Sequence, residues 1–252
     1  MPQVNQWVHQ LADRTLTEHG FSPSGKADDI LVCYQAMITS VLIHFRHPDL
    51  EAIERGIRWI LEYQFFELGT ITSWKGSGIQ KYGGCLRSTP CYIGLSKSCI
   101  ALSDYVHADW VRKDLKEEAS IKLQAGLGYI LDHQVYVRES KQEPITKDIT
   151  KLAYPFTYKV NVLELLRLLR TNDKLNDPGT AHARTFIRSK QKKDGFWRAL
   201  LFDILRIGFL LTNQNNPLSG FLMKLLSRLP KHDEGSIKND SDTNRILEMD
   251  LV

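Results

Sequence analysis

The stretch YQAMITSVLIHF, from Tyr34 to Phe45, has the clearest helical period in the chain. Its apolar residues recur at intervals of three and four positions, which is typical of a helix that buries one face. This stripe consists of Tyr34, Met37, Ile38, Val41, Leu42 and Phe45. A break at His47-Pro48-Asp49 and a second stripe over residues 50–65 predict a partner helix, so the two form an αα-hairpin.

The same pairing continues outward from this hairpin. One amphipathic helix is expected before it, over residues 1–20. After it, helices are expected over residues 93–104, 117–133, 159–170, 180–190, 196–211 and 217–229. No run alternates polar and apolar residues as a half-buried strand does, so the sequence predicts an all-α protein.

The composition is that of a globular protein, with 252 residues of which 42% are hydrophobic and 25% charged. We expect one helical domain over residues 1–230. Residues 231–252 are polar and almost without aromatic side chains, so we expect a disordered C-terminal tail there.

Charge and hydropathy exclude several classes of partner. The net charge of +4 comes from basic residues scattered along the chain, which argues against nucleic-acid binding. No apolar window is long enough to span a bilayer, and the polar N-terminal stretch lacks the apolar core of a signal peptide, so a cytoplasmic location is expected. The four cysteines are then expected to be reduced thiols.

The candidate functional centre is KYGGCLRSTPCYIGLSKSCIAL, from Lys81 to Leu102. Cys85 and Cys91 lie on a loop punctuated by Gly-Gly and Pro that leads directly into a helix. Such loops commonly carry reactive or metal-binding groups on a rigid scaffold. Cys99 falls inside the following helix among apolar residues, where a core position is expected.

Three segments of the chain resemble one another. Each has an aromatic residue followed five positions later by glutamine, near the end of an expected helix. The segments are RGIRWILEYQ (Arg55–Gln64), AGLGYILDHQ (Ala125–Gln134) and ARTFIRSKQKKDGFW (Ala183–Trp197). Their unequal spacing indicates repeated hairpins with loops of different length.

The third segment, with Gln191 followed by Asp194, Gly195, Phe196 and Trp197, resembles the repeat of the squalene cyclase and protein prenyltransferase superfamily. Within that superfamily the chain is most similar to a branch of short prokaryotic proteins, over roughly residues 31–197. The matching pieces are VCYQAM (Val32–Met37), WILEYQ (Trp59–Gln64), WKGSGIQKYGGCLRSTPCYIGLSKS (Trp74–Ser98) and YPFTYKVNVLELL (Tyr154–Leu166).

This resemblance implies an α/α toroid, here a partial or open barrel of αα-hairpins around a central cavity. GGCLRSTPCY is also similar to the zinc-binding region of protein prenyltransferase β-subunits, and the match of Cys91-Tyr92 implies that Cys91 is a metal ligand. Thr89 stands where that region has its ligand aspartate, so Cys85 or Cys33 would have to replace it. The acidic motifs of the terpene cyclases are absent, so neither cyclisation chemistry is implied.

The thiols allow three interpretations. Zinc held by Cys33, Cys85 and Cys91, with a histidine or water, suits the preference of zinc for thiolates and leaves a position open for substrate. Alternatively, Cys91 is a nucleophile whose pKa is lowered by the helix that follows it. In the third interpretation the thiols are small buried core residues.

Aromatic residues cluster on the helix starts and loops that a toroid would turn toward its cavity. We expect them to line a cavity for an isoprenoid or another apolar small molecule, although aromatic residues at helix ends also serve as ordinary packing. The candidates are Trp74, Tyr82, Tyr92, Tyr154, Phe156 and Tyr158.

Two functions remain open from the sequence. One is a prenyltransferase-like or terpenoid-cyclase-like protein that binds an isoprenoid beside a possible zinc site. The other is a non-catalytic helical repeat module that binds a peptide, a lipid or a partner protein through its concave face.

Overall fold

The computed structural model describes residues 2–82, 85–154, 158–193, 197 and 200–201. Most of these belong to one compact unit, made of the described residues up to 152 and those from 158 to 189. The described residues of 153–154 and 190–201 belong to a second unit. The expected helices over 196–211 and 217–229 and the expected tail over 231–252 fall largely or wholly outside the described residues.

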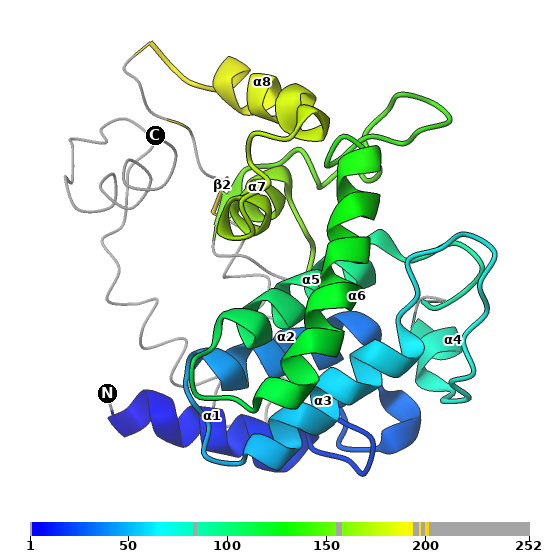
Figure 1. Ribbon diagram of the computed structural model, residues 1–252, viewed down its shortest axis with the longest axis vertical. Helices are drawn as coiled ribbons and strands as arrows, with labels where there is room; N and C mark the ends of the chain where they lie inside the picture. The colour runs from blue at the N-terminus through cyan, green and yellow to red at the C-terminus, as the bar shows by residue number, and fades with distance from the viewer. Residues whose placement is uncertain (1, 83–84, 155–157, 194–196, 198–199, 202–252) are drawn as a thin grey trace, which may run out of the picture. The chain divides into compact units, whose positions relative to one another are not determined.

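The described chain is helical, as the sequence predicted (Figure 1). The first unit contains α1 (Pro2–Thr15), η1 (Ala27–Asp29), α2 (Val32–His44), α3 (Leu50–Tyr63), α4 (Gly78–Tyr82), α5 (Tyr92–His107), α6 (Lys113–Asp132), α7 (Val162–Thr171), η2 (Pro178–Thr180) and α8 (Ala181–Ser189). The second unit contains a parallel pairing of β1 (Ala153–Tyr154) with β2 (Leu200–Leu201).

Helices α2 and α5 pack against each other and run in the same direction. At their starts, Val32 lies so close to Gly94 that a Cβ on Gly94 would be 3.0 Å from Val32 Cγ1. Near their ends, the Ser40 hydroxyl donates a hydrogen bond to the Asp104 carboxylate. The N-termini of these two helices therefore lie side by side.

Helix α7 continues this layer beside α5. Lys97 in the first half of α5 pairs with Glu164 in the first turn of α7. Near the helix ends, Asn172 Nδ2 donates a 2.9 Å hydrogen bond to Ser103 Oγ. We call α2, α5 and α7 the first layer, and all three of its helices begin at the same end.

Helices α3 and α6 form a second layer, each following its first-layer partner in the chain. Arg112, the N-cap residue of α6, pairs with Glu54 in the first half of α3. Gly126 in the second half of α6 lies against Phe66, just beyond the end of α3. These contacts show that α3 and α6 also run parallel, so consecutive hairpins stack in two layers.

The central helices are buried on more than one face, which corrects the predicted stripe. Tyr34 and Phe45, expected to point inward, are 38% and 42% exposed. Val32, Ala36 and Ile43, outside the predicted stripe, are buried. A single apolar stripe underestimates how much of α2 is buried, because α2 contacts α1, α3 and α5 on different faces.

The first helix is shorter than predicted. It ends at Thr15, and Leu16 pairs with Phe21 in an antiparallel bridge. The buried Gln35 side chain holds this turn by accepting a hydrogen bond from the Phe21 amide and donating one to the Gly56 carbonyl. An amphipathic pattern cannot reveal such a tertiary contact. Here the contact stabilises a turn over residues that the pattern assigned to the end of the helix.

The repeated glutamines are not equivalent in the structure. Gln64 is almost fully buried at the C-cap of α3, where its side chain donates to the Phe65 carbonyl. Gln134 adopts a positive φ of 47° just after α6. Gln191 pairs with Trp197 in a bridge of the second unit. Each marks the end of a helix, as the repeat pattern predicted.

No helix in the described residues has both the length and the apolar character needed to cross a membrane.

Two glycines of α6 give a matched test of how closely α5 and α6 pack. A Cβ on Gly126 would collide with Cys99 Sγ and the Phe66 ring, whereas a Cβ on Gly128 would meet nothing within 4 Å. We expect Gly126→Ala to lower the free energy of unfolding by about 1–3 kcal/mol, measured by urea denaturation with far-UV circular dichroism.

Gly128→Ala is the control. It removes a helix-interior glycine without a clash, so it should raise the free energy of unfolding by up to about 1 kcal/mol. Equal effects of the two substitutions would contradict the described packing of α6 on α5.

Candidate functional site

Three thiols meet where α2 and α5 begin. Cys33 lies in the first turn of α2, Cys85 in the loop after α4, and Cys91 at the N-cap of α5. Cys85 and Cys91 share a hydrogen bond, and Cys33 is close enough to both for their charges to interact. The structure thus brings together all three cysteines that the sequence marked as candidate ligands, and we call them the thiol cluster.

Within the thiol cluster, Cys91 is the sulfur that most readily carries negative charge. The hydrogen bond from Cys85 lowers the pKa of Cys91 to about 6, with further lowering from the backbone amides of Ile93 and Gly94. Those amides belong to the first turn of α5, where the helix has no intrahelical acceptors for them. Cys91 is half-buried, whereas Cys33 and Cys85 are buried.

The other two thiols are held in the protonated form. The hydrogen bond to Cys91 raises the pKa of Cys85, because Cys85 acts as the donor. Burial raises the pKa of Cys33 to about 11, and the negative charge of Cys91 adds to this effect. Negative charge in the cluster is therefore favoured on Cys91 over Cys33 and Cys85.

A buried ion pair lies beside the thiol cluster. Lys97 Nζ is 2.6 Å from Glu164 Oε1, and their side chains are only 4% and 10% exposed. The charge of Lys97 also reaches Cys33, where it favours the thiolate form. Burial raises the pKa of Glu164, while Lys97 opposes that rise.

The local structure of α7 orients Glu164 toward α5. Asn161 is the N-cap residue, and its Oδ1 accepts a 3.0 Å hydrogen bond from the Glu164 amide. Glu164 Oε2 is buried and has no hydrogen-bond partner among the described residues. A buried carboxylate oxygen without a partner is costly, which makes this end of α7 a place for a further polar contact.

The sequence analysis missed Lys97. The sequence pattern that could have identified it is a lysine between two serines, Ser96 and Ser98, in a helix that is otherwise largely apolar. Both serines are fully buried, and their hydroxyls have no partner among the described residues. A buried lysine needs an acid on a neighbouring helix, and only the tertiary structure identifies Glu164 as that acid.

An exposed aromatic pair lies next to Cys33. The rings of Tyr34 and Tyr158 stack with centroids 6.4 Å apart and an interplanar angle of 11°. Both side chains are about 40% exposed. Tyr158 is one of the predicted cavity-lining residues, whereas Tyr34 was expected in the buried stripe.

The other predicted lining residues lie apart from this pair. Trp74 packs against Trp59 and Tyr63, and Tyr92 is buried with its hydroxyl donating to the Val135 carbonyl. The side chains of Tyr82 and Tyr154, and all of Phe156, lie outside what the structure describes. The described aromatic residues thus do not form one continuous lining.

The metal site stays a prediction from the sequence, and the described arrangement of side chains adds nothing to it. Within the described part of the chain, no three His, Cys, Asp or Glu side chains are placed so that they could hold a metal ion. Chemically, the thiol cluster offers a soft anionic sulfur at Cys91 that can bind a soft cation or attack an electrophile.

Comparison with known proteins adds no assignment: no family model, no curated protein and no solved structure matches this chain.

The low pKa of Cys91 is testable by alkylation. In chelator-treated protein, the rate of reaction of Cys91 with iodoacetamide should rise with a midpoint near pH 6, since the thiolate is the reactive form. Peptide mapping by mass spectrometry follows each cysteine separately. Cys99, which is fully buried, should stay unmodified in the folded protein.

Cys85→Ala tests the cause of this shift, because alanine removes the donor that stabilises the Cys91 thiolate. The Cys91 midpoint should move upward toward the ordinary thiol value of about 8.5. A midpoint near that ordinary value already in the unaltered protein would contradict the described electrostatics of the cluster.

Removing one member of the buried ion pair should be strongly destabilising. Lys97→Met leaves Glu164 buried without its counter-charge, and we expect the free energy of unfolding to fall by about 3–5 kcal/mol at neutral pH. The loss should be smaller at lower pH, because an isolated Glu164 can take up a proton.

The double variant Lys97→Met, Glu164→Leu should recover most of this stability, since no buried charge remains. Asp109→Asn removes the exposed pair of Arg46 with Asp109 and should change the free energy by about 1 kcal/mol or less. A Lys97→Met variant as stable as Asp109→Asn would show that the pair is not buried.

Proposed function

We propose that this protein is a prenyltransferase-like or terpenoid-cyclase-like α/α toroid that binds an isoprenoid or similar apolar molecule beside the thiol cluster. The observation that carries the proposal is the convergence of Cys33, Cys85 and Cys91 next to the exposed Tyr34–Tyr158 pair. Reactive sulfur and an accessible aromatic surface thus occur at one end of the first layer.

The arrangement of hairpins supports the toroid part of this proposal. In an α/α toroid each hairpin contributes one inner and one outer helix, and all inner helices begin at the same end. The first layer of α2, α5 and α7 has this arrangement, with α3 and α6 behind it. In this proposal, further hairpins beside α2 or α7 would close the ring.

The Tyr34–Tyr158 pair would hold the apolar part of the ligand. Flat aromatic faces bury hydrocarbon well and attract positive charge that develops on a carbon chain. Tyr34 directly follows Cys33 in the sequence, so a chain lying on this pair would reach the thiol cluster.

A zinc ion at this site would be held by Cys33, Cys85 and Cys91. Sulfur donors suit zinc in kind, but the described positions would have to rearrange, and Cys33 and Cys85 would have to lose their protons. When bound, zinc would supply Lewis-acid activation of a coordinated group. Without it, Cys91 alone supplies the thiolate, and the Ile93 and Gly94 amides stabilise that charge.

The stacked hairpins also favour a second candidate, a helical repeat module that binds a peptide or partner protein without catalysis. Two-layer stacks of αα-hairpins present an extended surface on one layer. The exposed Tyr34 and Phe45 of α2 would contribute to such a surface. In this function the thiol cluster would be a structural feature of the helix starts.

Ligand protection of Cys91 distinguishes the two candidates. Saturating farnesol should slow the alkylation of Cys91 several-fold, because the isoprenoid chain covers the half-buried sulfur. The Tyr158→Ala variant should lose this protection, while Phe45→Ala, which removes an equally exposed ring farther along α2, should keep it. Zinc content by elemental mass spectrometry, compared with a Cys85→Ala, Cys91→Ala variant, tests the metal.

Protection in the unaltered protein and its loss in Tyr158→Ala would support the isoprenoid proposal, with or without zinc. Alkylation of Cys91 at the same rate with and without farnesol would overturn it and favour the repeat module. About one zinc per chain that is lost in the cysteine variant would assign the thiol cluster as the metal site.

A further inference from the structure

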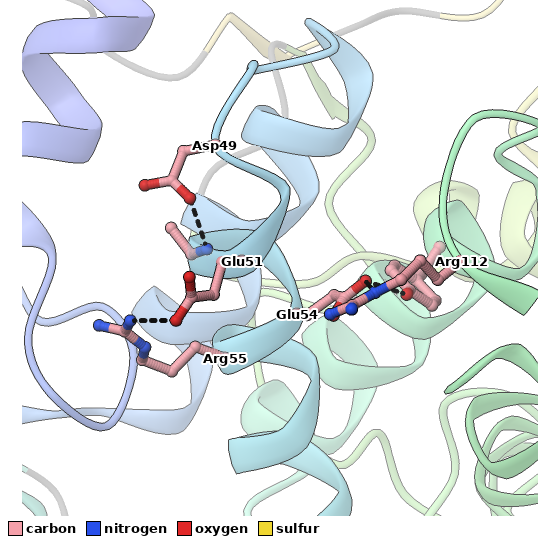
Figure 2. A network of polar contacts seen from close by, with 7 residues as sticks. Asp49, Glu51, Glu54, Arg55 and Arg112 are labelled. Carbon is pink, nitrogen blue, oxygen red and sulfur yellow. Dashed lines mark hydrogen bonds and ion pairs between the residues drawn. The ribbon is translucent and has the colours of Figure 1, made fainter. Parts of the chain in front are cut away.

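A charged recess lies along α3 and the start of α6, and no residue of the thiol cluster lines it. It is an open cavity of about 540 Å³ lined by Leu50, Glu51, Glu54, Arg55, Arg58 and Arg112. The charged residues of α3 in this lining follow Glu51 at i+3, i+4 and i+7, so they share one helical face. Figure 2 shows Arg55 and Arg112 on opposite sides of this face.

Arg112 is held rigidly at one side of the recess. Its Nε donates a 2.6 Å hydrogen bond to Glu54 Oε1, and its Nη2 pairs with Glu54 Oε2 (Figure 2). Glu54 is itself 2% exposed and also accepts a hydrogen bond from the Tyr105 hydroxyl. Arg112 remains 56% exposed, and its Nη1 group has no described acceptor. A buried carboxylate thus fixes a guanidinium whose outer edge is free.

Arg55 is fixed at the other side by the loop after α1. Its Nη1 donates a 3.0 Å hydrogen bond to the Thr17 carbonyl, which orients the planar group. Its Nη2 makes only a long 3.4 Å contact with Glu51, whose side chain is 83% exposed. Such an exposed pair contributes little stability, so a ligand can replace Glu51 there.

Arg58 is the third arginine that lines the recess. It is exposed, and no described residue forms an ion pair or hydrogen bond with it. A cation without a counter-ion beside two oriented guanidinium groups is a site that favours a negative ligand. All three cations of the lining are arginines, whose planar guanidinium groups can each hold two oxygens of one anion. A lysine ammonium group lacks this geometry.

We propose that the charged recess binds a small organic anion, whose phosphate or carboxylate group is held by Arg55, Arg58 and Arg112. The cavity volume falls within the range of small-molecule sites. Three arginines face only two glutamates, one of which is already used in fixing Arg112. The site is independent of the proposed isoprenoid function, because none of the thiols or the Tyr34–Tyr158 pair lines it.

Calorimetric titration tests the proposal with two probes. Pyrophosphate represents a phosphate ligand and citrate a carboxylate ligand. We expect at least one of them to bind saturably with one site per chain, with weaker binding as sodium chloride is raised. Whichever probe binds more tightly identifies the class of anion.

Arg58→Gln is the decisive variant, because Arg58 has no structural partner to lose. It should weaken binding about tenfold or more, since it removes a charge-assisted contact. Arg46→Gln is the matched control: Arg46 is exposed and does not line the recess, so binding should be unchanged. No saturable binding of either probe, or equal loss in both variants, would overturn the proposal.

Arg112 needs a paired substitution, because Arg112→Gln alone would leave Glu54 buried and unpaired. The double variant Glu54→Gln, Arg112→Gln keeps the recess neutral at that position. If it folds, as far-UV circular dichroism reports, binding should again weaken about tenfold. Unchanged affinity in this folded variant would remove Arg112 from the site and contradict the proposed three-arginine arrangement.

Discussion

The close parallel packing of α2 on α5 is the constraint from which the candidate site follows. Gly94 allows it, because any side chain there would press on Val32 at the start of α2. Since the two helices run in the same direction, their first turns lie together, and so do Cys33 and Cys91. The loop that carries Cys85 then closes over the same end. A shift of either helix by one turn, about 5.4 Å, would separate these thiols.

Burial at this end of the first layer has an electrostatic consequence. The starts of helices present unpaired amides, which favour negative charge, and Cys91 occupies such a position on α5. Further along α5, Lys97 is buried and pairs with Glu164 of α7. The helix-start amides and the Cys85 thiol thus favour negative charge on the half-buried Cys91, while Lys97 offsets the charge of the buried Glu164.

The two layers carry different chemistry. The first layer combines sulfur with exposed tyrosine rings, which suits an apolar ligand. The second layer presents guanidinium groups on α3 and at the start of α6, which suits an anion. Both features depend on the stacking of hairpins, because each draws residues from segments far apart in the sequence. Arg112, for example, lies 58 positions from Glu54, the acid that orients it.

The sequence by itself determined most of the longer helices that the structure describes, the loop that carries Cys85 and Cys91, and the all-α class, because apolar periodicity and Gly/Pro breaks act over a few neighbouring residues. The family resemblance added Cys33 to these two thiols as a candidate metal ligand. Only the tertiary structure decided that α1 ends at Thr15, that Tyr34 faces outward, and that Lys97 meets Glu164. These features depend on which helix lies against which, and local pattern carries no information about partners distant in the chain.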